Sequence, residues 1–145
     1  MNKVFIAYWS GTGNTETMAK QIAKGASEAG AEVVLKPVAE AAPEMVKEAA
    51  ALAFGCPAMG AEILEESEME PFISGLAQAE LGGKLLGLFG SYDWGDGQWM
   101  RDWVERMKNS GANVDGEGLI AQLVPTEDVL DRCYELGKRL AGNAA

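Results

Sequence analysis

Short apolar runs alternate with segments of helical periodicity along the whole of this chain of 145 residues. Five apolar runs bounded by turn residues predict strands, over 4–8, 32–35, 51–55, 85–89 and 119–123. Apolar residues spaced three and four apart predict helices over 14–29, 43–49, 71–79, 98–109 and 129–141. The helix over 98–109 has the clearest pattern, because Met100, Trp103 and Met107 share one face with Val104.

This alternation predicts an α/β fold. Strands interleaved with helices form right-handed βαβ units, so we expect a parallel sheet covered by helices on both faces. No linker, repeat or low-complexity tract interrupts the pattern, and a single domain over 1–145 is expected. Ligands bind such sheets outside the carboxyl ends of the strands, which directs attention to the loops after residues 8, 55 and 89.

The composition excludes several classes of active site and binding partner. The absence of histidine excludes a Ser-His-Asp triad, an imidazole base and a His-ligated metal. The formal charge of -10 argues against nucleic acid or an anionic membrane as partner. Two cysteines are too few for a disulfide framework or a Cys-rich zinc site; a single Cys56–Cys133 disulfide stays open, although free buried thiols are commoner. Without a targeting signal or a membrane span, we expect a cytoplasmic protein.

The loop after the first predicted strand has the composition of a phosphate site. It carries two glycines, three hydroxyls and an amide directly before a helix: Ser10, Gly11, Thr12, Gly13, Asn14 and Thr15. Backbone N–H groups and a helix N-terminus attract anions. No lysine follows Gly13, as a triphosphate loop requires, and Glu16 stands where a dinucleotide loop has its third glycine. The loop therefore suits one terminal phosphomonoester, with an ordinary capped turn as the alternative.

The two other loops carry large soft or aromatic side chains. Met59 follows the third strand and Trp94 the fourth, both at the same edge of the sheet as the phosphate loop. A flat ligand could lie between them, although Met59 alone could equally be a core residue. The first and third strands lack the terminal acids with which a phosphoryl-accepting receiver domain holds Mg²⁺. These residues predict a phosphorylated, planar cofactor that supplies its own chemistry.

Three motifs in register resemble the flavodoxins, most closely the short-chain type of anaerobic bacteria related to clostridia. They are residues 10–15, Met59-Gly60 followed by Glu62, and Ser91-Tyr92 with Trp94-Gly95-Asp96-Gly97. The resemblance implies a doubly wound, five-stranded parallel sheet of order 2-1-3-4-5 with helices on both faces. It also implies one flavodoxin-like domain that binds FMN noncovalently.

The resemblance also implies roles for individual residues. The FMN phosphate would lie in residues 10–15, and the other two loops would supply the remaining cofactor-binding residues: Ala58, Met59, Gly60, Glu62, Ser91, Tyr92, Trp94, Gly95 and Asp96. Trp94 and Met59 would cover its two faces, and Glu62 would approach the pyrimidine N3. The carbonyl of Gly60 would turn toward flavin N5–H on one-electron reduction. Pro57, Ala61 and Asp93 depart from the family pattern, where a serine, an aspartate and a glycine are usual.

The expected function is that of a low-potential one-electron carrier, not an enzyme, with no catalytic or metal-binding residues. It would cycle mainly between the semiquinone and hydroquinone forms of FMN and substitute for ferredoxin. Seven acids and no base lie between Glu48 and Gly83, and near the flavin they would oppose added negative charge. Expected partners are ferredoxin or flavodoxin reductases and low-potential oxidoreductases with basic surfaces. The protein itself is expected to be a monomer. The alternative is an FMN-dependent NAD(P)H or quinone oxidoreductase on the same fold.

Overall fold

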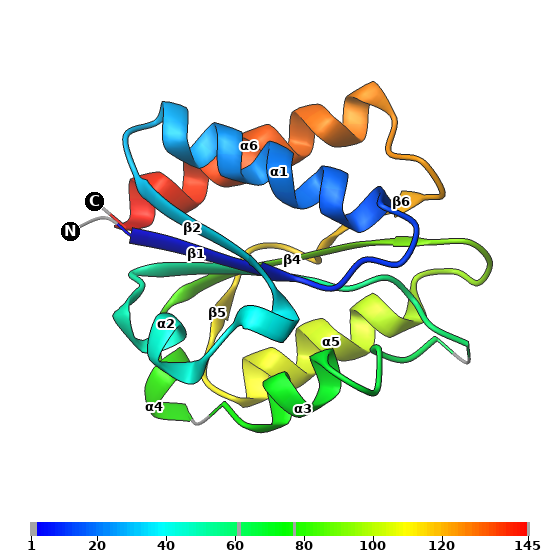
Figure 1. The fold of residues 1–145 in the computed structure, drawn as a ribbon, viewed down its shortest axis with the longest axis horizontal. Helices are drawn as coiled ribbons and strands as arrows, with labels where there is room; N and C mark the ends of the chain where they lie inside the picture. Colours follow the sequence, from blue (N-terminus) through cyan, green and yellow to red (C-terminus); the bar gives the residue numbers. More distant parts are fainter. Residues whose placement is uncertain (1–2, 61, 77, 145) are drawn as a thin grey trace.

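The structure, a computed structural model, describes residues 3–60, 62–76 and 78–144. Its helices and strands alternate along most of the chain (Figure 1). In chain order they are β1 (Lys3–Tyr8), α1 (Asn14–Glu28), β2 (Glu32–Pro37), α2 (Pro43–Glu48), β3 (Ala51–Gly55), α3 (Met69–Ser74), α4 (Gln78–Leu81), β4 (Leu85–Tyr92), α5 (Gln98–Asn109), β5 (Asn113–Val114), β6 (Leu119–Gln122) and α6 (Glu127–Ala144). Among the described residues, no helix has both the length and the apolar sequence that crossing a bilayer requires.

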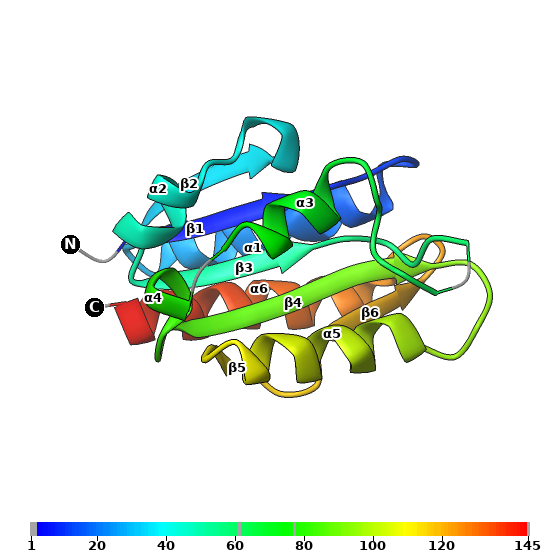
Figure 2. The same ribbon diagram turned by 90° about the horizontal axis from the view of Figure 1, so that it is seen from below.

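All strand pairs in the sheet are parallel, in the order β2-β1-β3-β4-β5, which confirms the predicted order (Figure 2). Helices α1 and α6 cover one face, and α2 to α5 lie on the other (Figure 1). Along β1, Val4 and Ile6 pack with the first layer, whereas Phe5 and Ala7 pack with the second. This alternation within a fully apolar strand is what burial on both faces of a parallel sheet requires.

The pairing of α1 with α6 depends on two glycines. A Cβ added at Gly25 would lie 2.1 Å from the backbone oxygen of Tyr134. A Cβ at Gly137 would lie 2.1 Å from the backbone oxygen of Ile22. Only residues without a side chain allow the two backbones this close, and the helices therefore form one compact layer against the sheet.

The single fifth strand expected over 119–123 is divided in two. β5 pairs with the beginning of β4, through Leu85 and Leu86, and β6 pairs with its end, from Phe89 to Tyr92. Between them, Gly116 and Gly118 adopt positive φ values of 63° and 86°, which let the chain leave the sheet and return. A strand of two residues, such as β5, is too short to show a recognisable apolar pattern in the sequence.

The end of β4 and the helix expected over 71–79 also differ from prediction. β4 continues beyond Phe89 to Tyr92 because Gly90, expected to end it, instead allows a close approach to β3: a Cβ there would lie 2.1 Å from the Cys56 carbonyl oxygen. The helix expected over 71–79 is two helices, α3 and α4. α3 ends where the Gly75 N–H donates to the Pro71 carbonyl oxygen; residue 77 of the predicted helix lies outside the described residues.

Candidate functional site

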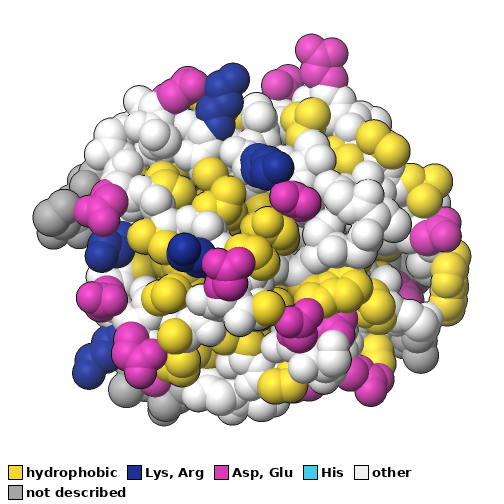
Figure 3. Space-filling model, viewed as in Figure 1, with side chains coloured by type: hydrophobic (Ala, Val, Ile, Leu, Met, Phe, Trp, Pro, Cys, Tyr) yellow, Lys and Arg dark blue, Asp and Glu magenta, His cyan; other side chains and the backbone are white. Residues whose placement is uncertain are grey.

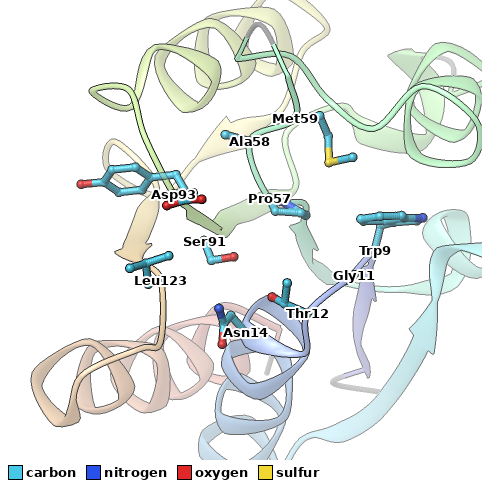
Figure 4. Close-up of a pocket in the computed structure, with 11 residues that line it drawn as sticks. Trp9, Gly11, Thr12, Asn14, Pro57, Ala58, Met59, Ser91, Asp93 and Leu123 are labelled. Atoms are coloured by element: carbon cyan, nitrogen blue, oxygen red, sulfur yellow. The ribbon is translucent and has the colours of Figure 1, made fainter.

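A cavity of about 260 Å³ opens at the carboxyl edge of the sheet, where the loops after β1, β3, β4 and β6 meet (Figure 4). Its wall is formed by Trp9, Gly11, Thr12, Asn14, Pro57, Ala58, Met59, Ser91, Tyr92, Asp93 and Leu123. Seven of these were predicted as site residues: Gly11, Thr12, Asn14, Ala58, Met59, Ser91 and Tyr92. All three predicted loops thus contribute to one cavity, at the edge of the sheet expected for a ligand.

The loop between β1 and α1 is shaped by Ser10. Its Oγ accepts hydrogen bonds from the N–H groups of Gly13, at 3.1 Å, and Glu16, at 3.2 Å. Gly13 has a φ of 95°, a left-handed conformation that suits a glycine at the start of the helix. Ser10 therefore holds the loop in shape from within.

Other donors of this loop remain available. Within the described part of the chain, the N–H groups of Thr12, Asn14 and Thr15 have no protein acceptor. They belong to the loop and the first turn of the 15-residue helix α1, where partial positive charge accumulates. This donor set, without a cation, matches a phosphomonoester, so the residues present fit the phosphate group expected there.

Thr15 lies behind the cavity wall. Its side chain is 1% exposed, and its Oγ1 lies 3.2 Å from the Oγ of Ser91 and accepts a hydrogen bond from the Ser91 N–H at 3.2 Å. The hydroxyl thus joins the beginning of α1 to the end of β4. Because the hydroxyl is engaged with Ser91, only the backbone N–H of Thr15 is available as a ligand donor. The side chain instead fixes the two loops relative to each other.

A tight turn presents Met59 to the cavity. Met59 and Ile63 form an antiparallel bridge, with reciprocal N–H to carbonyl hydrogen bonds of 3.0 and 3.1 Å. Gly60 within the turn has a φ of 33°, and the Ala58 N–H donates to the Ser91 carbonyl oxygen at 3.0 Å. Gly60 itself does not line the cavity. Ala61, the expected departure beside it, lies outside the described residues.

Glu62 connects two loops instead of lining the cavity. Its Oε1 accepts hydrogen bonds from the N–H groups of Gly97, at 3.2 Å, and Gln98, at 3.1 Å, at the beginning of α5. A Cβ added at Gly95 would lie 2.6 Å from the Glu62 carboxyl carbon. The carboxylate therefore stabilises the N-terminus of α5, and its expected approach to the flavin stays a prediction.

The structure brings Trp9, not Trp94, to the cavity wall. Trp94 is 63% exposed, and neither it nor Gly95 or Asp96 lines the cavity. Trp9 faces the cavity across from Asp93, and its Nε1 donates to Glu68 at 3.0 Å (Figure 4). An aromatic residue directly after the first strand and before the phosphate loop was the available signal for Trp9.

The base of the long loop after β3 is fastened by Glu65. The carboxylate, 6% exposed, accepts hydrogen bonds from the N–H groups of Ser67, Glu68 and Met69 and from the Ser67 hydroxyl. Burial raises the pKa of Glu65, but these hydrogen bonds outweigh it and lower the pKa to about 2. The Glu65 N–H in turn donates to Cys56 Sγ at 3.3 Å, which joins the two ends of the loop.

Both cysteines are free and buried, which confirms that expectation. Burial raises the pKa of each thiol to about 12, so neither is a thiolate at neutral pH. The two side chains pack in different layers, Cys56 with the α2 to α5 side of the sheet and Cys133 with the α1 and α6 side. They therefore serve as small core residues.

Charge is distributed unevenly around the cavity. Figure 3 shows hydrophobic and acidic side chains along the edge where the strands end, whereas the Lys and Arg side chains of this face lie toward the opposite edge and the centre. Every large hydrophobic side chain that is exposed among the described residues belongs to a loop at this edge: Ile63, Trp94, Leu123 and Val124. The cavity thus opens on a surface with apolar and acidic character.

Comparisons with known proteins agree with this geometry. The sequence model of the family described as Flavodoxin matches residues 6–137. The chain is 49% identical over 136 residues to a flavodoxin of Clostridium beijerinckii, covering 94% of this chain and 97% of that protein. It is 44% identical to a flavodoxin of Megasphaera elsdenii, covering 95% and 98%. The solution structure of two-electron reduced Megasphaera elsdenii flavodoxin superimposes with a TM-score of 0.84 at 43% identity, covering 96% of this chain and 98% of that one.

Proposed function

This chain belongs to the flavodoxin family, and on that premise we propose that it is a low-potential one-electron carrier that binds FMN noncovalently in the cavity at the carboxyl edge of the sheet. Flavodoxins are electron-transfer proteins rather than enzymes, so the NAD(P)H or quinone oxidoreductase alternative is not supported. FMN, when bound, supplies the one-electron chemistry. The observation that carries the proposal is a set of N–H groups at the start of α1 that have no acceptor among the described residues and lie directly beside an apolar cavity.

The phosphate would be held by backbone donors. The N–H groups of Thr12, Asn14 and Thr15 lack protein acceptors within the described residues and point to an anion at this helix terminus. Ser10 keeps the loop in the shape that leaves them free. Pro57 contributes no donor, so the N–H groups at the start of α1 would hold the phosphate without a donor from this position.

The ring would lie against the apolar part of the wall. Met59 and Trp9 stand together on one side of the cavity (Figure 4). The volume of about 260 Å³ is just below the ~300–1,000 Å³ of typical small-molecule sites, so an edge of the cofactor would reach the surface, where electrons enter and leave. We keep Trp94 as the residue that would cover the outer face, since it is exposed on the loop beside the cavity.

Acidic residues would hold the potential low and select partners. A carboxylate at about 10 Å opposes an added negative charge by roughly 0.4–1.7 kcal/mol for effective dielectric constants between about 80 and 20. The net charge of -10 and the acidic edge would attract redox proteins with basic surfaces, including those that also accept electrons from ferredoxin. We further propose that residues 1–145 act as a single FMN-binding domain, monomeric and cytoplasmic.

A redox titration of the FMN-loaded protein, followed by absorbance, tests the carrier function. We expect two resolved one-electron steps, the second at a potential more negative than that of free FMN. A NADPH oxidation assay of the same preparation is the control, and no turnover is expected without an added reductase. A single two-electron step, or sustained NADPH turnover, would contradict the proposal.

A further inference from the structure

Leu123 occupies a backbone conformation that its residue type disfavours. It follows β6 directly and has a φ of 58°, and within the described residues only Glu62 shares this property among residues other than glycine. The left-handed region is unfavourable for a residue with a Cβ, whereas glycine adopts it without this cost. Such strain persists where the surroundings impose it, and it concentrates at ligand sites.

The surroundings of Leu123 hold it in this conformation. Its N–H donates to the Tyr92 carbonyl oxygen at 2.7 Å, and the preceding Gln122 donates from Nε2 to the Asp93 carbonyl oxygen at 3.3 Å. Both contacts join the end of β6 to the end of β4, next to the cavity. The strained backbone is therefore part of the wall and not of a free loop.

The side chain of Leu123 has no core to fill. It is 52% exposed and yet lines the cavity, on the side facing Trp9 and Met59 (Figure 4). Val124, the next residue, is 72% exposed and does not line it. A half-exposed leucine gains little from burial in the protein alone, whereas a ligand in the cavity would cover its apolar surface.

We propose that Leu123 is a cofactor-contact residue, whose strained backbone directs an apolar side chain against the FMN opposite Trp9 and Met59. This inference rests on the proposed function. It assigns a binding role to the loop after β6. None of the site residues predicted from the sequence motifs lies in that loop. The side chain would add apolar contact to the cofactor and keep water from that side of the cavity.

The test compares Leu123→Gly, Leu123→Ala and the matched control Val124→Ala in the full chain. The dissociation constant for FMN is measured by quenching of FMN fluorescence, and the stability of the FMN-free protein by urea unfolding. We expect Leu123→Gly to raise the dissociation constant about five- to tenfold while the urea midpoint stays the same or rises. Leu123→Ala should weaken FMN binding similarly but have a lower midpoint than Leu123→Gly, because it keeps the strain. Val124→Ala should change neither.

Two outcomes would overturn this inference alone: wild-type protein binds FMN and Leu123→Gly binds it within twofold as tightly, or Val124→Ala weakens binding as much as Leu123→Gly. Wild-type protein that fails to quench FMN fluorescence would overturn the proposed function and this inference together. The two failures are therefore distinguishable in one experiment.

Discussion

Replacing Glu65 by glutamine removes the buried carboxylate that fastens the loop after β3. The carboxylate accepts N–H hydrogen bonds of 2.8 Å from Ser67, 2.7 Å from Glu68 and 3.0 Å from Met69. Glutamine keeps one oxygen but turns an NH₂ group toward donors that then lack an acceptor. We expect Glu65→Gln to lower the free energy of unfolding and to loosen the loop that carries Met59.

The magnitude follows from the pKa of Glu65. Its hydrogen bonds lower the pKa from 4.5 to about 2, and at about 1.4 kcal/mol for each pH unit this corresponds to about 3 kcal/mol. Because the folded state has the lower pKa, this stabilisation is complete above about pH 5 and is lost as the pH falls through 4.5 toward 2. At pH 3 less than half of it remains, about 1.4 kcal/mol.

Urea unfolding of the FMN-free chain at pH 7 and pH 3, followed by circular dichroism, measures this contribution. We expect Glu65→Gln to cost about 2–4 kcal/mol at pH 7 and less than half as much at pH 3. Glu66→Gln, which makes the same change in charge at an exposed neighbour, is the control and should alter stability by less than about 0.5 kcal/mol. A loss below about 0.5 kcal/mol for Glu65→Gln, or an equal loss at both pH values, would show that the ionised carboxylate does not stabilise the folded chain.

Two further predictions concern buried groups. Thr15→Val leaves the Ser91 N–H without its acceptor, and a loss of about 1–3 kcal/mol in urea unfolding is expected; an unchanged midpoint would show that the link between α1 and β4 contributes nothing. Cys56 and Cys133 are fully buried with pKa values raised to about 12, so Ellman's reagent at pH 8 should label neither in the native protein and both in denaturant. Rapid labelling of the native chain would contradict this burial.

Much of the fold could be predicted because each strand buried on both faces forms a continuous apolar run. β3 was predicted at its observed bounds, Ala51–Gly55, and α5 at Gln98–Asn109. The division of the fifth strand could not be predicted, because a two-residue strand has no pattern. The extension of β4 was missed because Gly90, a turn signal locally, is required by the approach of the Cys56 carbonyl from another strand.

In the candidate site, too, residues placed by contacts between distant segments could not be predicted from local sequence. Its phosphate loop is contiguous in sequence, and local chemistry was enough to predict it. Trp9 stands directly before the phosphate loop, and that position was a signal the prediction did not use. Leu123 reaches the cavity only because the loop after β6 packs beside loops distant in sequence, so no local motif indicated it. The acidic run was expected to act through its negative charge near the flavin, yet Glu65 is buried and Glu70 pairs with Arg106 at 2.6 and 2.8 Å. The pairing of Glu70 with Arg106 joins residues far apart in sequence, so the local sequence could not predict it.

Calorimetric titration of the FMN-free chain with FMN and with riboflavin tests whether the start of α1 binds the cofactor's phosphate, because the two ligands differ only by that group. That phosphate would accept hydrogen bonds from the N–H groups of Thr12, Asn14 and Thr15, which have no protein acceptor within the described residues. Even two of these three N–H groups, at about 1.5–3 kcal/mol for each charge-assisted hydrogen bond, predict riboflavin affinity at least about 100-fold weaker than that of FMN. We expect one FMN per chain with this preference. Equal affinities for the two ligands, or no FMN binding, would contradict the account.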